Sequence, residues 1–118
     1  MLLSHPKRIL CVSRDPWLLS TRKHLLQYSG YQVESKVSIR HAIDSLKTSH
    51  FDLILIGHSV ASPDRTEFIA QCRSAAPSIP VVFVSSMDEP EIEFLADATT
   101  RPIPEDVVGT IDRILRIS

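Results

Sequence analysis

Phe51-Asp52-Leu53-Ile54-Leu55-Ile56-Gly57 is the stretch of sequence that decides the fold. Its four central residues are all apolar, and no polar residue interrupts them. An unbroken apolar run of this length is typical of a β-strand that is buried on both faces. Strands of that kind belong to parallel sheets, which helices cover on either side. The stretch therefore predicts the interior of an α/β domain.

Four further stretches extend the predicted sheet. Arg8–Val12 and Val81–Val84 are similar apolar runs, Tyr31–Glu34 alternates, and Ala96–Thr100 is a weaker candidate. The predicted helices alternate with these strands and cover Pro16 to about Ser29, Ile39 to about Ser49, Pro63 to about Ala75, a short Glu89–Leu95, and Pro104–Ile117. Five strand-helix units in succession predict a three-layer α/β/α fold with a doubly wound parallel sheet, as a single domain over residues 1–118.

Short polar residues mark where the predicted helices begin and end. Asp15 stands directly before a proline and Ser38 before an amphipathic stretch, so both are expected to be N-caps. Gly30 is expected to close the first helix. Asp64 is expected to cap the third helix near Pro63.

The spacing of apolar residues orients the first helix. Leu18, Leu25 and Leu26 are expected to face the core, which would turn Trp17 and Leu19 outward. Exposed aromatic residues are enriched at protein interfaces. Trp17 and Leu19 are therefore predicted to lie at a possible interface with a partner, or Trp17 folds over the edge of the sheet.

Composition excludes several classes of protein. The 118 residues are 43% apolar and carry a net charge of −1, without the basic excess of a nucleic-acid-binding protein. No apolar run approaches the length of a membrane span, and the N-terminus does not resemble a signal peptide, so a cytoplasmic location is expected. Cys11 and Cys72 have no metal-ligand spacing and are expected to be buried. Neither a metal nor another cofactor is predicted.

Polar residues follow four of the predicted strands, at the edge where an open α/β sheet binds its ligands. They are Ser13-Arg14-Asp15, Gly57-His58-Ser59, Ser85-Ser86 and Thr100-Arg101-Pro102. His58 has no partner that the sequence identifies and is expected to face solvent. A separate acidic run, Asp88 to Asp97, contains five acids and no base, and is expected to be a solvated face or to attract a basic partner.

The order of elements, together with three short motifs, resembles the receiver domains of two-component response regulators. The motifs are the Ser29-Gly30-Tyr31-Gln32-Val33 turn, Phe51–Ile56 and the Arg101-Pro102 pair, and the resemblance covers residues 7–117. It implies a CheY-like, flavodoxin-like fold with five parallel strands in the order 2-1-3-4-5. It also implies that 16 residues from Ser85 to Arg101 are several fewer than receivers usually have, so the fourth helix is shortened.

The resemblance also implies where a phosphorylation pocket would lie, and what has replaced it. Ser13 and Arg14 stand where receivers carry the acidic pair that holds Mg²⁺, and Gly57 stands at the phosphoacceptor aspartate. Ser85 keeps the family's hydroxyl, and Arg101 replaces its lysine. Mg²⁺ requires oxygen ligands, and glycine has no side chain to phosphorylate. The chain is therefore expected to be a pseudo-receiver that is not phosphorylated, is not an enzyme and has no catalytic residue.

A protein partner is the expected target: a histidine kinase, a response regulator or an output protein in trans, with a homodimer as a further option. Two alternatives remain open. The first is a small-anion sensor in which Arg14 and Arg101 form the pocket, with Ser13 and Ser85 as donors; the opposing interpretation pairs both arginines with nearby carboxylates. The second is a flavodoxin-like enzyme, which the three glycines and the lack of a nucleophile–base pair disfavour.

Overall fold

A computed structural model describes residues 6–88, 90–91 and 93–116. The elements are β1 (Arg8–Val12), α1 (Pro16–Tyr28), β2 (Gln32–Lys36), α2 (Ile39–Thr48), β3 (Leu53–Gly57), α3 (Ser62–Ala75), β4 (Val81–Val84), β5 (Ala98–Thr100) and α4 (Pro104–Arg116). All strand pairs are parallel, in the order β2-β1-β3-β4-β5. The predicted fold and strand order are confirmed.

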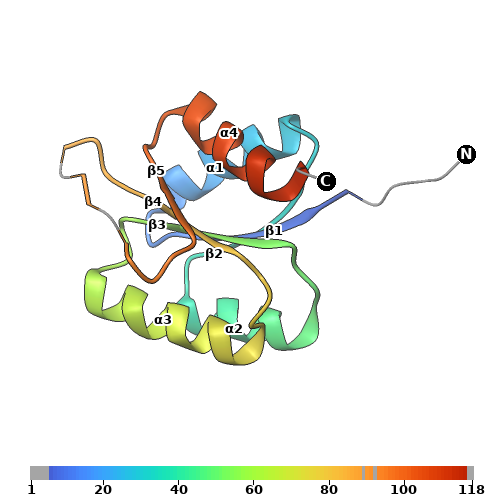
Figure 1. Cartoon of the computed structure of the whole chain (residues 1–118), viewed down its shortest axis with the longest axis vertical. Helices are drawn as coiled ribbons and strands as arrows, with labels where there is room; N and C mark the ends of the chain where they lie inside the picture. Colours follow the sequence, from blue (N-terminus) through green and yellow to red (C-terminus); the bar gives the residue numbers. More distant parts are fainter. Residues whose placement is uncertain (1–5, 89, 92, 117–118) are drawn as a thin grey trace, which may run out of the picture.

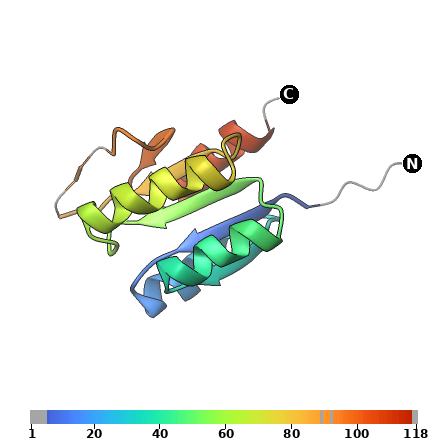
Figure 2. The same ribbon diagram turned by 90° about the horizontal axis from the view of Figure 1, so that it is seen from below.

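Two helices cover each face of the sheet (Figures 1 and 2), with α1 and α4 on one side and α2 and α3 on the other. Each layer has its own apolar core. Ile9, Leu55 and Val84 point toward α1 and α4, while Leu10, Ile54 and Phe83 point toward α2 and α3. Side chains alternate along each strand, so the central strands need apolar residues at every position, and this is why they are continuous apolar runs.

Most of the predicted helix ends are confirmed. The Asp15 carboxylate accepts hydrogen bonds from the backbone N–H groups of Trp17 and Leu18, and Ser38 caps α2. Gly30 follows α1 with φ at 98°, a conformation that favours glycine. The predicted cap of α3 is wrong, because the N-cap is Ala61, which has no side-chain oxygen, and Asp64 lies inside the first turn.

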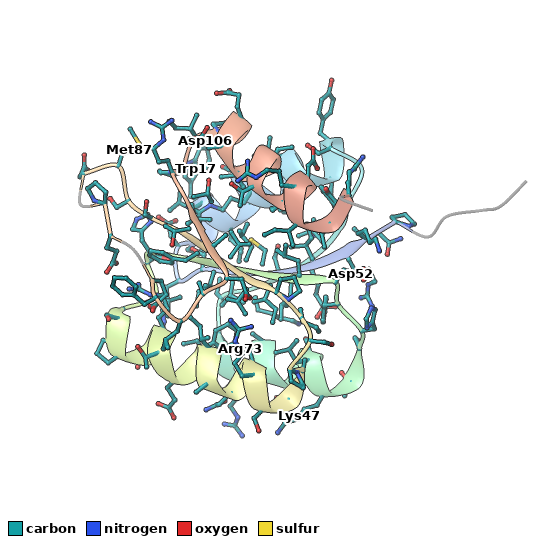
Figure 3. All side chains as sticks on the ribbon, in the orientation of Figure 1. Trp17, Lys47, Asp52, Arg73, Met87 and Asp106 are labelled. Atoms are coloured by element: carbon teal, nitrogen blue, oxygen red, sulfur yellow. The ribbon has the colours of Figure 1, made fainter. Side chains whose placement is uncertain are left out.

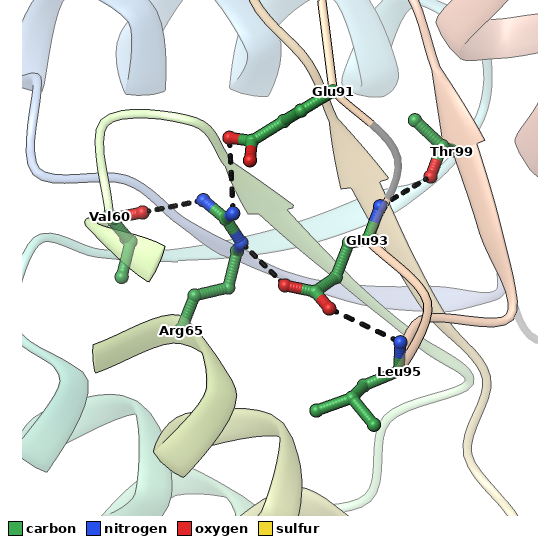
Figure 4. A network of polar contacts seen from close by, with 6 residues as sticks. All are labelled: Val60, Arg65, Glu91, Glu93, Leu95 and Thr99. Carbon is green, nitrogen blue, oxygen red and sulfur yellow. Dashed lines mark hydrogen bonds and ion pairs between the residues drawn. The ribbon is translucent and has the colours of Figure 1, made fainter. Parts of the chain in front are cut away.

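The connection between β4 and β5 differs from the prediction of a short helix over 89–95. Glu89 and Ile92 lie outside the described residues, and the described remainder of this segment is not helical. Figure 4 shows what holds it instead: the guanidinium of Arg65 on α3 pairs with Glu93 at 2.8 Å and Glu91 at 3.1 Å. Glu93 in turn accepts from the Leu95 N–H and donates its own N–H to Thr99.

The sequence suggested that the acidic run is a solvated face, but part of it is paired with basic residues of the same chain. Glu91 and Glu93 pair with Arg65, and Asp97 pairs with Arg73 at 3.0 Å. The two arginines belong to α3, far from the acids in sequence. The local sequence shows that a segment is acidic, but it does not show which distant basic residues folding brings next to it.

The remaining sequence expectations concern burial and membrane insertion. Both cysteines are buried, as predicted, and burial raises the pKa of each thiol to about 12. Within the described segments, every helix is too short or too polar to serve as a membrane span. The Arg101-Pro102 peptide bond is trans.

Candidate functional site

The carboxyl edge of the sheet brings together the residues predicted to form a pocket. Ser13 and Ser85 are buried at the ends of β1 and β4, and Gly57 ends β3. Arg14 and Arg101 are exposed. The predicted positions are thus present at one edge, but the two arginines lie at its surface and the two serines lie inside.

A small hydrogen-bond network links the segments that follow β1 and β3. The hydroxyls of Ser13 and Ser59 lie 2.8 Å apart, and Ser59 Oγ accepts from the Arg14 N–H at 2.9 Å. Ser13 Oγ also accepts from the Asp15 N–H at 3.2 Å. Among the described residues, no imidazole or carboxylate hydrogen-bonds to either hydroxyl, so neither serine has the base that an activated nucleophile needs.

Arg14 and Arg101 do not converge on a shared anion site. Arg14 pairs with Asp64 at 3.3 Å, and Arg101 pairs with Asp106 at 2.7 Å. Both ion pairs are largely exposed, so neither contributes much to stability. The opposing interpretation of the sequence, in which each arginine has a carboxylate of its own, describes the structure.

Arg22 is the residue of this site that sequence reasoning missed. It lies on the inner face of α1 and is only 6% exposed. A Cβ at Gly57 would lie 2.5 Å from Nη1 of Arg22 and 3.7 Å from the hydroxyl of Ser13. The guanidinium therefore occupies the space into which any side chain at position 57 would extend. The available signal was the spacing of four residues between Arg22 and Leu26, which puts both on one face of the helix.

Arg22 also differs electrostatically from the other charges of the site. Burial lowers its pKa, and the proximity of Cys11 and Asp15 offsets this only in part. In the described part of the chain, Arg22 makes no hydrogen bond and no ion pair. Asp15 is not a direct partner, because its carboxylate caps α1. Among the described residues, no carboxylate pairs directly with this nearly buried cation, and Asp15 acts on it only from a distance.

The two residues predicted at an interface differ in exposure, and the interface itself stays a prediction. Trp17 is 77% exposed, on the first turn of α1, and Figure 3 shows it in the same layer as Asp106 of α4. Leu19 was expected to face outward, but it is buried. The inner stripe is Leu19, Arg22 and Leu26, because the aliphatic stem of Arg22 packs inward, and this turns Leu18 and Leu25 partly toward the surface.

His58 was expected to face solvent, yet it is half-buried and its Nδ1 is enclosed without a hydrogen-bond partner. Elsewhere on the described surface, Met87 is exposed on the connection that follows β4 (Figure 3). In residues 6–88, 90–91 and 93–116, no three side chains of the metal-binding types gather as a potential metal site. A hydroxyl network, a glycine and a cation therefore make up the chemistry of this edge.

Comparisons with known proteins agree on the fold. No family model matches the chain. The transcriptional regulatory protein BasR of Escherichia coli is 28% identical over 81 residues, which are 69% of this chain and 36% of BasR. The chain thus spans little more than a third of the length of the curated relative that it matches.

Solved structures of receiver domains superpose over nearly the whole chain. A CheY-like receiver domain from Methanospirillum hungatei has a TM-score of 0.82 and 23% identity, with 95% of each chain covered. Chemotaxis response regulator CheY4 of Vibrio cholerae has a TM-score of 0.81 and 23% identity, covering 94% of this chain and 100% of CheY4. A putative response regulator from Chloroflexus aurantiacus reaches 0.84 at 16% identity, with 96% and 100% covered. The fold is therefore CheY-like.

Proposed function

We propose that this chain is a receiver-like module of two-component signalling that acts without phosphorylation, by binding a protein partner in the cytoplasm. It is not an enzyme in this proposal. The CheY-like fold and the partial similarity to BasR support the signalling class. The partner belongs to the proteins that receivers contact: a kinase, another regulator or an output protein.

The occupation of the space at Gly57 is the observation that carries the proposal. Phosphoryl transfer to a receiver needs a carboxylate at this position and Mg²⁺ beside it. Here the position holds a glycine, and Nη1 of Arg22 lies 2.5 Å from where its Cβ would be. The neighbouring Ser13 is a neutral ligand at best and is already hydrogen-bonded to Ser59. A cation in this place also repels Mg²⁺.

Two measurements test the absence of phosphorylation. Mg²⁺ titration, followed by Trp17 fluorescence, is expected to give a flat trace because the nearby carboxylates are engaged: Asp15 caps α1 and Asp64 pairs with Arg14. Incubation with Mg²⁺ and acetyl phosphate is expected to leave the intact mass unchanged. A phosphoryl adduct on the native chain, mapped to any residue of this edge, would overturn the proposal. A variant with Ser13→Asp, Arg14→Asp, Arg22→Leu and Gly57→Asp serves as a gain-of-function comparison.

The partner surface is tested with a matched pair of aromatic residues. Trp17 and Tyr28 are both strongly exposed on α1, at opposite ends of the helix. Pull-down from a lysate of the source organism is expected to lose its specific partner with Trp17→Ser and to keep it with Tyr28→Ser. Loss with Tyr28→Ser alone would move the interface away from the carboxyl edge. Retention with both variants would remove Trp17 from the proposal.

A further inference from the structure

Two arginines are nearly buried in the described chain, and only one of them has its charge compensated. Arg65 has two carboxylates and the Val60 carbonyl. Arg22, at 6% exposure, has no acceptor among the described residues. Transfer of a charge out of water is unfavourable unless it is paired and hydrogen-bonded. The guanidinium of Arg22 therefore retains unused capacity to bind an anion.

The guanidinium of Arg22 is nearly buried but not fully enclosed. Ser35 Oγ and His58 Nδ1 are the fully enclosed side-chain polar atoms that lack a partner in the described part of the chain. The nitrogens of Arg22 are not among them, so its guanidinium keeps an edge toward solvent. Nη1 of Arg22 lies over Gly57 at the end of β3, in the space that a side chain at position 57 would need, and the hydroxyl of Ser13 borders the same space.

We propose that Arg22 binds a small oxyanion, such as inorganic phosphate, non-covalently at the carboxyl edge between β1 and β3. A guanidinium presents parallel N–H donors that match two oxygens of a phosphate or carboxylate. The bound anion supplies the countercharge that the protein does not. This site is distinct from one formed by Arg14 and Arg101, whose guanidinium groups are paired with Asp64 and Asp106.

The inference does not rest on the proposed function. Anion binding requires neither a protein partner nor membership of the receiver family. It is measured without any phosphorylation of the chain. If the partner experiment fails, the anion site still stands, and if the anion site fails, the partner surface at Trp17 is unaffected.

Thermal unfolding in phosphate tests the site. A ligand that binds the folded chain raises the folding equilibrium constant by the factor 1 + [L]/Kd, which is about 100-fold at 100 times Kd. We expect a saturable rise of Tm with inorganic phosphate over chloride at matched ionic strength. Phosphate also stabilises proteins without binding, through exclusion from their surface. The diagnostic quantity is therefore the difference between the native chain and Arg22→Met.

Matched variants locate the effect. Arg22→Met is expected to lose the saturable component, whereas Arg14→Gln and Arg101→Gln keep it. Gly57→Asp is expected to weaken the response as well, because its carboxylate competes for the guanidinium from within. Equal phosphate responses in the native chain and Arg22→Met would overturn the inference, as would loss of the response in Arg14→Gln or Arg101→Gln.

A second readout covers the case in which Arg22→Met does not fold. In the native chain, the Nε–H resonance of Arg22 in a ¹⁵N-correlated spectrum is expected to shift with phosphate, with the same midpoint as the Tm. Arg65 Nε–H, which already donates to Glu93, is expected to stay in place. Shifts of the Arg14 or Arg101 resonances without Arg22 would assign the anion elsewhere and overturn the inference.

Discussion

Arg65 and Arg22 are buried to a similar degree on opposite faces of the same sheet, yet their surroundings differ completely. Arg65 is 2% exposed and donates to Glu93, Glu91 and the Val60 carbonyl, and its guanidinium lies 4.3 Å from the centre of the Phe83 ring. Arg22 is 6% exposed and has no such partners in the described residues. The first environment satisfies a cation, and the second leaves it uncompensated.

This difference separates a structural arginine from a candidate binding residue. Arg65 joins α3 to the connection between β4 and β5, which has no described helix of its own (Figure 4). Removal of Arg65 or of Glu93 leaves the other charge buried without its partner. Arg22 makes no hydrogen bond or ion pair within the described residues, so it does not join two elements in the way that Arg65 does. The four predictions below test this contrast.

The largest expected effect belongs to Arg65→Met. Truncating one partner of a buried ion pair typically destabilises by about 3–5 kcal/mol, because the other charge stays buried. Glu93, whose side chain is 9% exposed, would be that charge. Urea unfolding monitored by circular dichroism measures the loss. Arg73→Met is the control, since the ion pair of Arg73 with Asp97 is half-exposed and its loss is expected to cost far less. Equal losses of stability in the two variants would contradict a larger contribution from the buried ion pairs of Arg65.

Arg22→Met is expected to act in the opposite direction. An unpaired cation that is replaced by an apolar side chain of similar length no longer has to be desolvated, so stability in phosphate-free buffer is expected to hold or to rise by about 1–2 kcal/mol. The same urea titration checks this. A loss as large as that of Arg65→Met would show that Arg22 has a structural partner, and the comparison between the two arginines would fail.

Asp15→Ala sharpens the account of Arg22. The variant removes an N-cap, which is worth about 1 kcal/mol. It also removes the carboxylate whose negative charge stabilises the cation of Arg22. Ser38→Ala is the matched control, because it removes the cap of α2 only. We expect Asp15→Ala to destabilise slightly more than Ser38→Ala. If the two losses are equal, Asp15 contributes nothing to Arg22.

The smallest expected effect concerns acid stability and depends on the carboxylate of Asp52. Burial alone would raise the pKa of Asp52, but the Arg8 N–H at 2.8 Å and His50 at 3.1 Å outweigh it and lower the pKa. The stabilisation from Asp52 is therefore present above the unfolded pKa, near ~3.9, and is lost as the pH falls through the lower folded value. Asp52→Asn is expected to flatten the acid limb of the stability curve by less than about 1 kcal/mol. An unchanged limb would contradict this assignment.

Much of the fold was predictable from local sequence. The apolar runs at β1, β3 and β4 identified the buried strands, because each side chain there meets a helix layer. Asp15 and Ser38 were predictable as caps, since a short polar side chain before a helix bonds the free N–H groups of its own first turn. The described part of the connection between β4 and β5 was not predictable, because Glu91 and Glu93 pair with Arg65, which is more than twenty residues away.

The candidate site was predicted only in outline. The positions of Ser13, Gly57 and Ser85 at one edge followed from the parallel topology, and Trp17 was correctly expected to be exposed. Leu26 was correctly placed on the inner face of α1, but Leu18 and Leu25 were not, because an arginine was not counted as an inward residue. Arg22 buries its aliphatic stem while its charged end reaches the edge of the sheet, and a hydropathy pattern treats the whole residue as polar.

The sequence by itself determined the five strands, four of the five predicted helices, their order and the absence of a carboxylate at positions 13, 14 and 57. Those properties are local, since they depend on which residues follow one another along the chain. Only the tertiary structure decided which charges compensate one another. Folding pairs Arg14, Arg65 and Arg101 with carboxylates, whereas Arg22 has no such pair in the described part of the chain. Electrostatic compensation depends on distances across the fold, and sequence spacing does not give those distances.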